Sequence, residues 1–315
     1  MSMPQLIGAE RLAKGLWWGR AWSLIEGCTP VSPGCKHCWA AKAAHMRRGQ
    51  SNPKVRAANA GLTYTDGGIN PPRFNGAVRC REDLLDKPLR TRTPTFWSIW
   101  ADLFHESVPF DFIDRVLAVV ALCPQHVFVI CTKRAERMKE YFTRPYMPGA
   151  ICDAACRMWK HLHSRERVVH DEGEYIKLTP VPWPFPNLIT MVTAEDQPRA
   201  DERIPLLVDT PSACRAVAIE PALGPVDLEY VPGMYDGDGH DNPWMKTPGL
   251  DWIIIGQETG RGARKADIAW FRSIRDQCHA AGVPLFVKQS PHGKSIIDEV
   301  EYREFPEMKE ITHVD

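Results

Sequence analysis

Three cysteines stand within eleven residues near the start of the chain: Cys28, Cys35 and Cys38. Prolines and a glycine constrain the loop between them, and we expect a helix to begin near Cys38. A structural zinc site uses four protein ligands, whereas a [4Fe–4S] cluster held by three cysteines leaves one iron open to an exogenous ligand. A helix amino terminus also stabilises thiolates through its dipole, which suits an anionic cluster. The pattern therefore indicates a metal centre with an open coordination position.

The C-x6-C-x2-C spacing leaves three interpretations open. An iron–sulfur cluster bound by the three cysteines is the one we favour. A zinc ion is the second, with its fourth ligand supplied by His37, His45 or Cys80. Three unrelated buried cysteines are the third, and the loop built around them argues against it.

A second candidate metal site combines Cys152 and Cys156 with His161 and His163. The two cysteines are four positions apart, so on a helix they share one face. The same segment, a predicted helix over residues 150–164, carries apolar residues at helical spacing. The sequence therefore favours an amphipathic helix that contains two small cysteines over a metal or an auxiliary cluster.

Composition excludes a strongly charged protein and a membrane-spanning one. Lys plus Arg and Asp plus Glu both number 39 in a chain of 315 residues, so no global field attracts a polyanion. The longest apolar run, Val116–Cys123, is far shorter than a membrane span, and nothing resembles a signal peptide. We therefore expect a cytoplasmic protein whose cysteines are thiols or metal ligands.

Short apolar runs typical of buried parallel strands recur along the chain. They cover residues 21–26, 95–101, 126–131, 187–193, 215–219, 251–256 and 284–288. Helical patterns fall between many of them, at residues 110–122, 132–141, 200–208 and 266–281, the last ended by Gly282 as a C-cap. This alternation predicts an α/β fold, either a full or partial (β/α) barrel or a doubly wound open sheet.

Polar residues recur where the predicted strands end, and this favours the barrel. They are Cys28, Asp102, Thr132, Lys133, Glu195, Glu220, Gln257 and Glu258. Barrel enzymes place their sites at the carboxyl ends of their strands.

We interpret residues 1–315 as a single domain with loop insertions at about 50–93, 145–186 and 231–249. Basic residues gather in and beside the first insertion, with Tyr64 and Phe74 between them. They are Arg47, Arg48, Lys54, Arg56, Arg79, Arg81, Lys87, Arg90 and Arg92. Cations mixed with aromatic rings can follow a phosphate backbone and stack a base, so we expect a nucleic acid or nucleotide partner. Solvated loop charge is the alternative.

Seven motifs, in order along nearly the whole chain, carry a resemblance to a known family. They are EGCTPVSPGCKHCWA (26–40), SIWADLFH (98–105), CTKRAERM (131–138), VTAEDQPRADERIPLL (192–207), EPALGPV (220–226), WIIIGQETG (252–260) and FVKQSPHG (286–293). The chain resembles a phage-associated family of three-cysteine barrel proteins that is distantly related to radical S-adenosylmethionine (SAM) enzymes and spore photoproduct lyase. Trp39, Gln257 and Ser290 depart from the family pattern.

The resemblance implies a barrel of the radical SAM type and a cofactor pair. Cys28, Cys35 and Cys38 would hold a [4Fe–4S] cluster whose fourth iron binds SAM, and reductive cleavage of SAM would yield a 5′-deoxyadenosyl radical. The expected cofactor-binding residues are His37, Asp102, Lys133, Arg134, Thr193, Glu195 and Arg203. The expected substrate-facing candidates for catalysis are Glu220, Glu258 and Lys288. The alternative is that some of these side chains pair with one another to hold the barrel mouth.

The resemblance further implies a radical SAM enzyme that acts on a nucleic-acid base or nucleotide, as in phage-type DNA base modification. The reaction would be an isomerisation, a lyase reaction or a carbon–carbon bond formation. A flavodoxin or ferredoxin type of electron donor would supply the electron, and a phage-encoded protein would work in the host cytoplasm. The runner-up is a zinc- or cluster-containing nucleic-acid-binding protein without catalysis. A protein that binds SAM without cleaving it is the third possibility.

Overall fold

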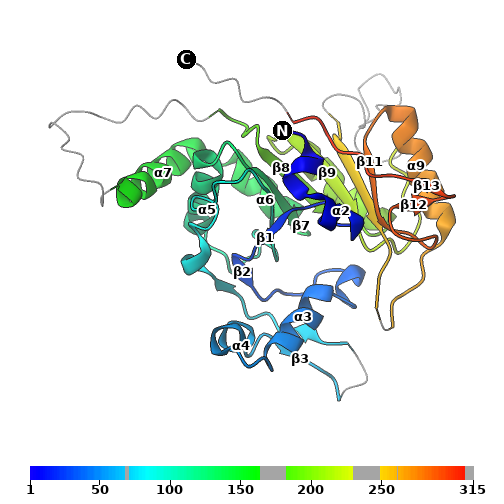
Figure 1. The fold of residues 1–315 in the computed structure, drawn as a ribbon, viewed down its shortest axis with the longest axis horizontal. Helices are drawn as coiled ribbons and strands as arrows, with labels where there is room; N and C mark the ends of the chain where they lie inside the picture. Colours follow the sequence, from blue (N-terminus) through cyan, green and yellow to red (C-terminus); the bar gives the residue numbers. More distant parts are fainter. Residues whose placement is uncertain (68–70, 164–181, 230–248, 261, 309–315) are drawn as a thin grey trace.

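A curled sheet of seven parallel strands organises the protein in the computed structural model, which describes residues 1–67, 71–163, 182–229, 249–260 and 262–308 (Figure 1). The order of the strands in the sheet is their order in the chain. They are β1 (Arg20–Trp22), β6 (Phe96–Ile99), β7 (Val127–Thr132), β8 (Leu188–Thr193), β9 (Cys214–Ile219), β10 (Trp252–Gly256) and β11 (Leu285–Gln289). Parallel strands covered on both faces are continuously apolar, which is why the apolar runs located them.

The larger helices cover one face of this sheet. They are α5 (Phe110–Leu122), α6 (Ala135–Thr143), α7 (Met147–His163), α8 (Gln197–Val208) and α9 (Ile268–Ala281). Their apolar residues form one core with side chains of β6 to β11. A doubly wound sheet would reverse its strand order and carry helices on both faces. The protein is therefore a one-sided partial (β/α) barrel, and β1 and β11 are the two edge strands of its sheet.

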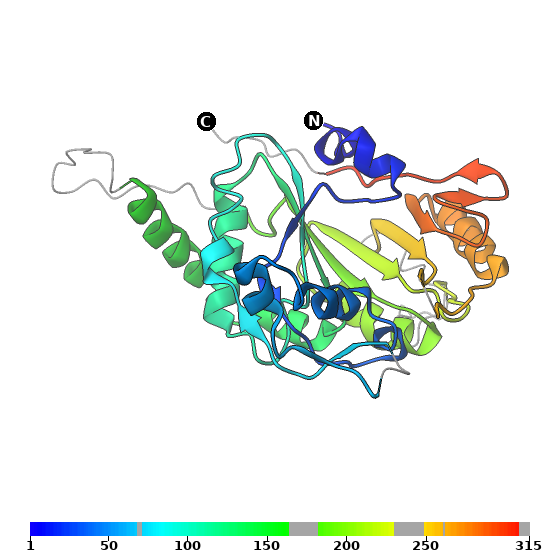
Figure 2. The ribbon, with the colours of Figure 1, turned by 60° about the horizontal axis from the view of Figure 1, so that its bottom comes forward.

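Apolar residues from the two ends of the described chain cover the other face of the sheet. Trp17, which follows the helices α1 (Met3–Ile7) and α2 (Ala9–Ala13), packs against Phe96 and Trp252. Phe305 packs against Trp252 from the carboxyl-terminal side, and the Trp252 indole N–H donates to a backbone carbonyl 3.0 Å away in the same segment. Figure 2 shows both ends along the same side of the sheet.

A small lobe extends from the carboxyl ends of the first strands (Figure 1). It holds the helices α3 (Trp39–Arg47) and α4 (Pro53–Asn59) and two antiparallel pairs of very short strands. The pairs are β2 (Ile25–Glu26) with β5 (Arg79–Cys80), and β3 (Thr63–Tyr64) with β4 (Arg73–Phe74). A further hairpin, β12 (Ile296–Ile297) and β13 (Val300–Glu301), lies near the carboxyl end.

The element predictions are confirmed apart from one strand and some boundaries. The segment predicted as one strand over residues 21–26 divides, because the Leu24 N–H donates to the Trp22 carbonyl in a tight turn. Helix α8 begins at Gln197, earlier than predicted, because the Asp196 side chain accepts from a first-turn N–H. Gly282 ends α9 in the left-handed conformation, as predicted. Most of the insertion predicted at 231–249 lies outside the described residues.

None of the described helices combines the length and apolar character needed to cross a membrane.

Candidate cysteine-loop site

The cysteine loop, residues 27–38, lies at the carboxyl edge of the sheet. Cys28, Cys35 and Cys38 are partly exposed and form no disulfide. Cys38 is the N-cap of α3, as the sequence predicts, and the backbone N–H groups of Ala40 and Ala41 oppose the rise that burial causes in its pKa. The first turn of this helix therefore presents its unpaired N–H groups to a thiolate.

Glu195 binds the middle of the cysteine loop to the sheet. It follows β8, is fully buried, and accepts hydrogen bonds from the Ser32 hydroxyl and, at 3.1 Å, from the Gly34 N–H. Lys133 lies 3.0 Å and Arg203 3.1 Å from its carboxylate oxygens. Burial alone would raise the pKa of Glu195, but Lys133, Ser32 and Arg203 together hold it below its usual value of 4.5. Glu195 is therefore an ionised anchor for the loop.

Position 34 of the loop requires glycine, because there is no space for a side chain beside Lys133 and Glu195. A Cβ atom there would lie 2.7 Å from the Lys133 ammonium and 2.8 Å from a Glu195 oxygen. The loop can approach the ion pair closely only because this position has no side chain.

Arg134 binds the start of the cysteine loop. Its guanidinium lies 2.9 Å from Asp102, 3.2 Å from the Thr29 carbonyl and 3.9 Å from the Cys28 sulfur. Asp102 also accepts from the Thr132 hydroxyl at 2.6 Å and from two backbone N–H groups. The two residues predicted to bind a cofactor, Asp102 and Arg134, are thus bonded to each other and to the loop.

Arg264 also binds the middle of the loop, at Pro33. It pairs with Glu258 through two guanidinium nitrogens, one at 3.0 Å, and donates to the Pro33 carbonyl at 3.1 Å. Burial, the first cause, lowers the pKa of His37, although the Glu258 charge opposes the shift. The His37 Nδ1 atom is buried and has no hydrogen-bond partner among the described residues.

Glu220 and Lys288 form an ion pair across an intervening strand. Glu220 follows β9 and Lys288 belongs to β11, so β10 separates them. Gly256 ends β10, and a Cβ atom there would lie 3.4 Å from both side chains. The pair is only partly buried, which leaves both groups near solvent at the same edge of the sheet.

The predicted site residues therefore share one edge, and many of them bond to one another. Arg203 also donates to the Thr193 carbonyl at 2.7 Å, which completes a protein-bonded group around Glu195. These bonds agree with the alternative interpretation from the sequence, in which the site residues pair with one another and hold the barrel mouth together. Their roles toward a cofactor or substrate stay predictions.

Sequence reasoning missed three residues that hold the loop: Ser32, His105 and Arg264. His105 lies 2.9 Å from the Thr29 hydroxyl, and its pKa is lowered first by burial and then by Arg134. His105 stands in the motif at 98–105, and Ser32 stands in the cysteine motif itself. For Ser32 and His105, their place in a motif was a signal in the sequence that could have identified them. Arg264 lies outside every motif, so the sequence held no such signal for it.

The donor chemistry of the loop fits a group bound by three thiolates. Burial raises the pKa of Cys28 to about 12, with Asp102 adding to the shift and Arg134 opposing it, and burial also raises the pKa of Cys38. A metal replaces these protons when it binds thiolates. Lys133 and Arg134 lie behind the loop and favour the anionic form of its sulfurs.

Other candidate ligands lie elsewhere. His45 bonds to Thr63 and Arg48 through its two ring nitrogens, at 3.2 and 3.0 Å, and Cys80 lies on β5. Among the described residues, no three His, Cys, Asp or Glu side chains converge as the ligands of one metal ion.

Cys152 and Cys156 share one face of α7, as their spacing predicts, and their side chains form a hydrogen bond. Helix α7 packs its apolar face into the main core, which agrees with the amphipathic interpretation. The side chains of His161 and His163 lie outside the described residues.

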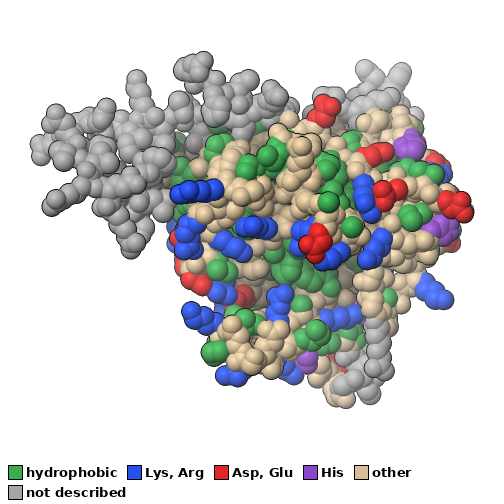
Figure 3. Space-filling model, viewed as in Figure 1, with side chains coloured by type: hydrophobic (Ala, Val, Ile, Leu, Met, Phe, Trp, Pro, Cys, Tyr) green, Lys and Arg blue, Asp and Glu red, His purple; other side chains and the backbone are tan. Residues whose placement is uncertain are grey.

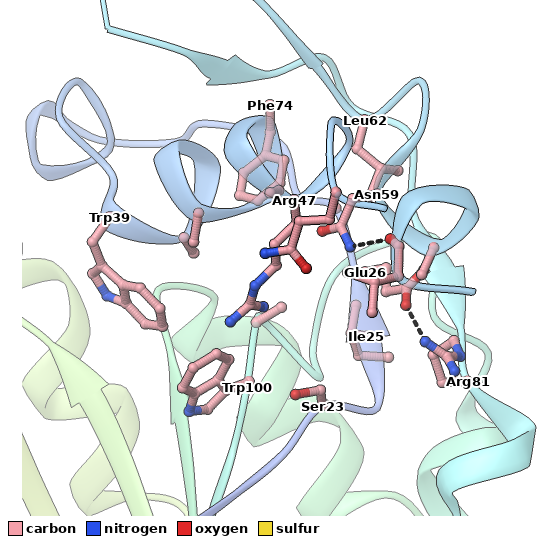
Figure 4. A pocket seen from close by; sticks show the side chains of 18 of the residues that line it. Ser23, Ile25, Glu26, Trp39, Arg47, Asn59, Leu62, Phe74, Arg81 and Trp100 are labelled. Carbon is pink, nitrogen blue, oxygen red and sulfur yellow. Dashed lines mark hydrogen bonds and ion pairs between the residues drawn. The ribbon is translucent and has the colours of Figure 1, made fainter. Parts of the chain in front are cut away.

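A cavity of about 550 Å³ opens beside the cysteine loop, between the small lobe and the first strands (Figure 4). Trp39, Arg47 and Lys54 line it from the lobe, and Trp100 and Ala101 line it from the end of β6. Figure 3 shows Lys and Arg side chains around a recess with hydrophobic side chains at its floor.

These features define an α/β partial-barrel protein whose strand ends hold a three-cysteine loop beside a cavity. The chain belongs to the DUF5131 family, described as a protein of unknown function, whose family model matches residues 13–306. No curated protein and no solved structure matches the chain.

Proposed function

We propose that this protein is a radical SAM enzyme of the partial-barrel type, with a [4Fe–4S] cluster bound by Cys28, Cys35 and Cys38. One observation carries the proposal: three free thiols on one loop, held at the carboxyl edge of a parallel sheet by residues that follow the three strands β7, β8 and β10. That edge is where barrel enzymes assemble their sites.

When bound by Cys28, Cys35 and Cys38, such a cluster would supply the electron for reductive cleavage of SAM, the source of a radical that could take a hydrogen atom from a substrate. The protein contributes position and electrostatics. Glu195, Arg134 and Arg264 hold the loop at three points, so the thiols keep their places. The first turn of α3 stabilises the Cys38 thiolate.

Groups near the loop have capacity left for small ligands. Lys133 keeps a fifth of its side chain exposed beside Ser32 and Glu195. Its ammonium group can therefore donate to a carboxylate such as that of SAM. The partly exposed pair of Glu220 and Lys288 can donate or accept a proton at the substrate.

The substrate we propose is a nucleic-acid base or nucleotide, because Arg47 and Lys54, which form no ion pair with the residues that the structure describes, lie on the small lobe near the ring of Trp39. The reaction class is an isomerisation, a lyase reaction or a transfer that forms a carbon–carbon bond. A flavodoxin or ferredoxin type of donor would supply the electron.

Anaerobic reconstitution followed by electron paramagnetic resonance of the dithionite-reduced protein tests the proposal. We expect about four irons per chain, a [4Fe–4S]⁺ signal that shifts when SAM is added, and 5′-deoxyadenosine as a product. Zinc without iron would replace the proposal with the nucleic-acid-binding alternative. SAM affinity without 5′-deoxyadenosine would leave a SAM-binding protein that has no radical chemistry.

The variant Cys35→Ala should lose the signal and SAM cleavage while its thermal unfolding stays close to wild type, because Cys35 lies outside the cores. Cys80→Ala is the matched control, since this thiol belongs to the lobe but not to the cysteine loop. It should keep its iron and its activity. Retained SAM cleavage in Cys35→Ala would reject the assignment of the ligands.

A further inference from the structure

The cavity of about 550 Å³ contacts both ends of the cysteine loop. Its lining includes Gly27, which precedes Cys28, and Trp39 and Ala40, which follow Cys38. A ligand in this cavity would therefore lie against both ends of the cysteine loop. The volume of about 550 Å³ is in the range of small-molecule sites, roughly 300 to 1,000 Å³.

Two indole rings form one wall of the cavity. The ring centroids of Trp39 and Trp100 are 4.8 Å apart, with an angle of 77° between the rings. Trp100 is braced from behind by Trp18, at 5.6 Å. Trp39 keeps 54% of its surface exposed, which is unusual for the largest apolar side chain. An exposed, braced indole is a platform on which a planar ring can stack.

Two cations line the same cavity, and neither forms an ion pair with any residue that the structure describes. The Arg47 guanidinium carbon lies 5.7 Å from the Trp100 ring centroid, and Figure 4 shows this side chain directed toward Trp100. Lys54 stands on α4, across the cavity. By contrast, Arg81 is neutralised by Glu26 and by Asp83. Arg47 and Lys54 are therefore available to an anion.

The remaining wall combines apolar side chains with Ser23, Gln50, Asn59 and the ion pair of Glu26 and Arg81. Leu62 and Phe74 are buried beneath the cavity and belong to the small core of the lobe. Ala101, at the end of β6, has a positive φ of 61°, a strained conformation that places this backbone at the cavity wall. The cavity thus combines a stacking wall, an apolar floor and two unpaired cations.

We infer that this cavity binds one nucleotide unit, with its base stacked on Trp39 and its phosphate paired with Arg47 and Lys54. The inference rests on the proposed function only where it makes the bound nucleotide the substrate. Binding of the nucleotide to the cavity does not need the iron–sulfur cluster. SAM carries two positive groups and one carboxylate, so the two cations disfavour it here. A free nucleotide and a nucleotide within a single strand share this chemistry.

Isothermal titration of the full-length protein with ligands that share one base tests the inference. The probes are 2′-deoxyadenosine, its 5′-monophosphate (dAMP), the oligonucleotide dA4 and SAM, each titrated before and after iron reconstitution. We expect dAMP to bind at least about tenfold more tightly than the nucleoside and than SAM. Tighter binding of dA4 than of dAMP assigns a strand as the source, and the reverse assigns a free nucleotide.

Four variants locate the site. Arg47→Gln should weaken dAMP about tenfold and leave the nucleoside unchanged, whereas Trp39→Ala should weaken both about tenfold. Arg48→Gln is the control for charge, since Arg48 neighbours Arg47 on the chain but bonds to His45 outside the cavity. Tyr64→Ala is the control for aromatic exposure, since Tyr64 does not line the cavity. Neither control should change the affinity for dAMP.

Three results would overturn the inference: SAM binding more tightly than dAMP, no dAMP binding at low salt, or dAMP affinity unchanged in Trp39→Ala. The two proposals fail separately. A protein that binds dAMP but forms no 5′-deoxyadenosine keeps the nucleotide site and loses the radical function. A protein that cleaves SAM but binds no dAMP keeps the radical function and loses this site.

Discussion

At the scale of single residues, the carboxylate of Glu195 does most to place the cysteine loop. It is fully buried, yet it accepts bonds from Ser32 and Gly34 of the loop while it pairs with Lys133 and Arg203. A buried charge is tolerated only when its partners compensate for lost hydration. The loop itself supplies part of that compensation, so the stability of the anchor and the position of the loop are coupled.

We expect Glu195→Gln to destabilise the protein by about 3 kcal/mol at about pH 7, because it removes the buried charge partner of the buried Arg203. The pKa of Glu195 is held below 4.5, so its stabilising effect is present above that value and is lost as the pH falls through the lowered pKa. The difference in unfolding free energy between wild type and variant should therefore narrow below about pH 4.5.

Chemical denaturation across this pH range measures the effect. Glu202→Gln is the matched control, because Glu202 is exposed and lies 3.8 Å from the same arginine. It should change the unfolding free energy by less than about 0.5 kcal/mol. A gap between wild type and Glu195→Gln that stays constant with pH would show that the charge is not the cause.

At the scale of elements, the sequence predicted what is local and missed what depends on distant partners. The buried strands stand out because each is a continuous apolar run, and α9 stands out because its apolar residues recur at helical spacing and Gly282 directly follows them. Each strand in the two strand pairs of the lobe has only two residues, which is too short to show a periodic pattern of apolar residues. Likewise, Arg264 reaches Pro33 across 231 positions, a contact that only the fold creates. The strand-end carboxylates were predictable, as was their pairing with neighbouring site residues as an alternative role, but which residue bonds to which was not.

Helix α4 offers a test of how far one element controls the cavity. Its seven residues begin at the Asn52 cap, whose side chain accepts from the Lys54 and Val55 N–H groups. We expect Asn52→Ala to weaken the helix by about 1 kcal/mol. Faster amide hydrogen exchange in residues 53–59 should accompany a lower affinity for dAMP, since Lys54 stands in the first turn.

Asp267→Ala is the comparison variant. Asp267 caps α9 in the same way, but neither Asp267 nor α9 lines the cavity. It should speed exchange in α9 and leave dAMP affinity unchanged. An equal loss of affinity in both variants would show that general destabilisation, and not α4, is responsible.

At the scale of the whole molecule, the aromatic core that stabilises the protein and the candidate site lie at different parts of the sheet. The face opposite the helices is filled by an aromatic core that includes Trp17, Phe96 and Trp252. The cysteine loop and the cavity lie at the carboxyl edge instead. Trp17 and Trp18 are adjacent in the chain but differ in what they contact: Trp17 is buried within the aromatic core, whereas Trp18 packs against that core and also on Trp100 at the cavity.

The two adjacent tryptophans should therefore separate the two properties. We expect Trp17→Ala to lower the unfolding free energy by about 3 kcal/mol, because it empties a buried aromatic site, and to leave dAMP affinity unchanged in the folded protein. Trp18→Ala should cost less stability, since Trp18 is only partly buried, but should weaken dAMP severalfold because Trp100 loses its support. Denaturant unfolding and calorimetric titration of both variants measure this. If Trp17→Ala weakened dAMP as much as Trp18→Ala did, the aromatic core and the cavity would form one coupled unit, and the separation argued from their positions in the sheet would be wrong.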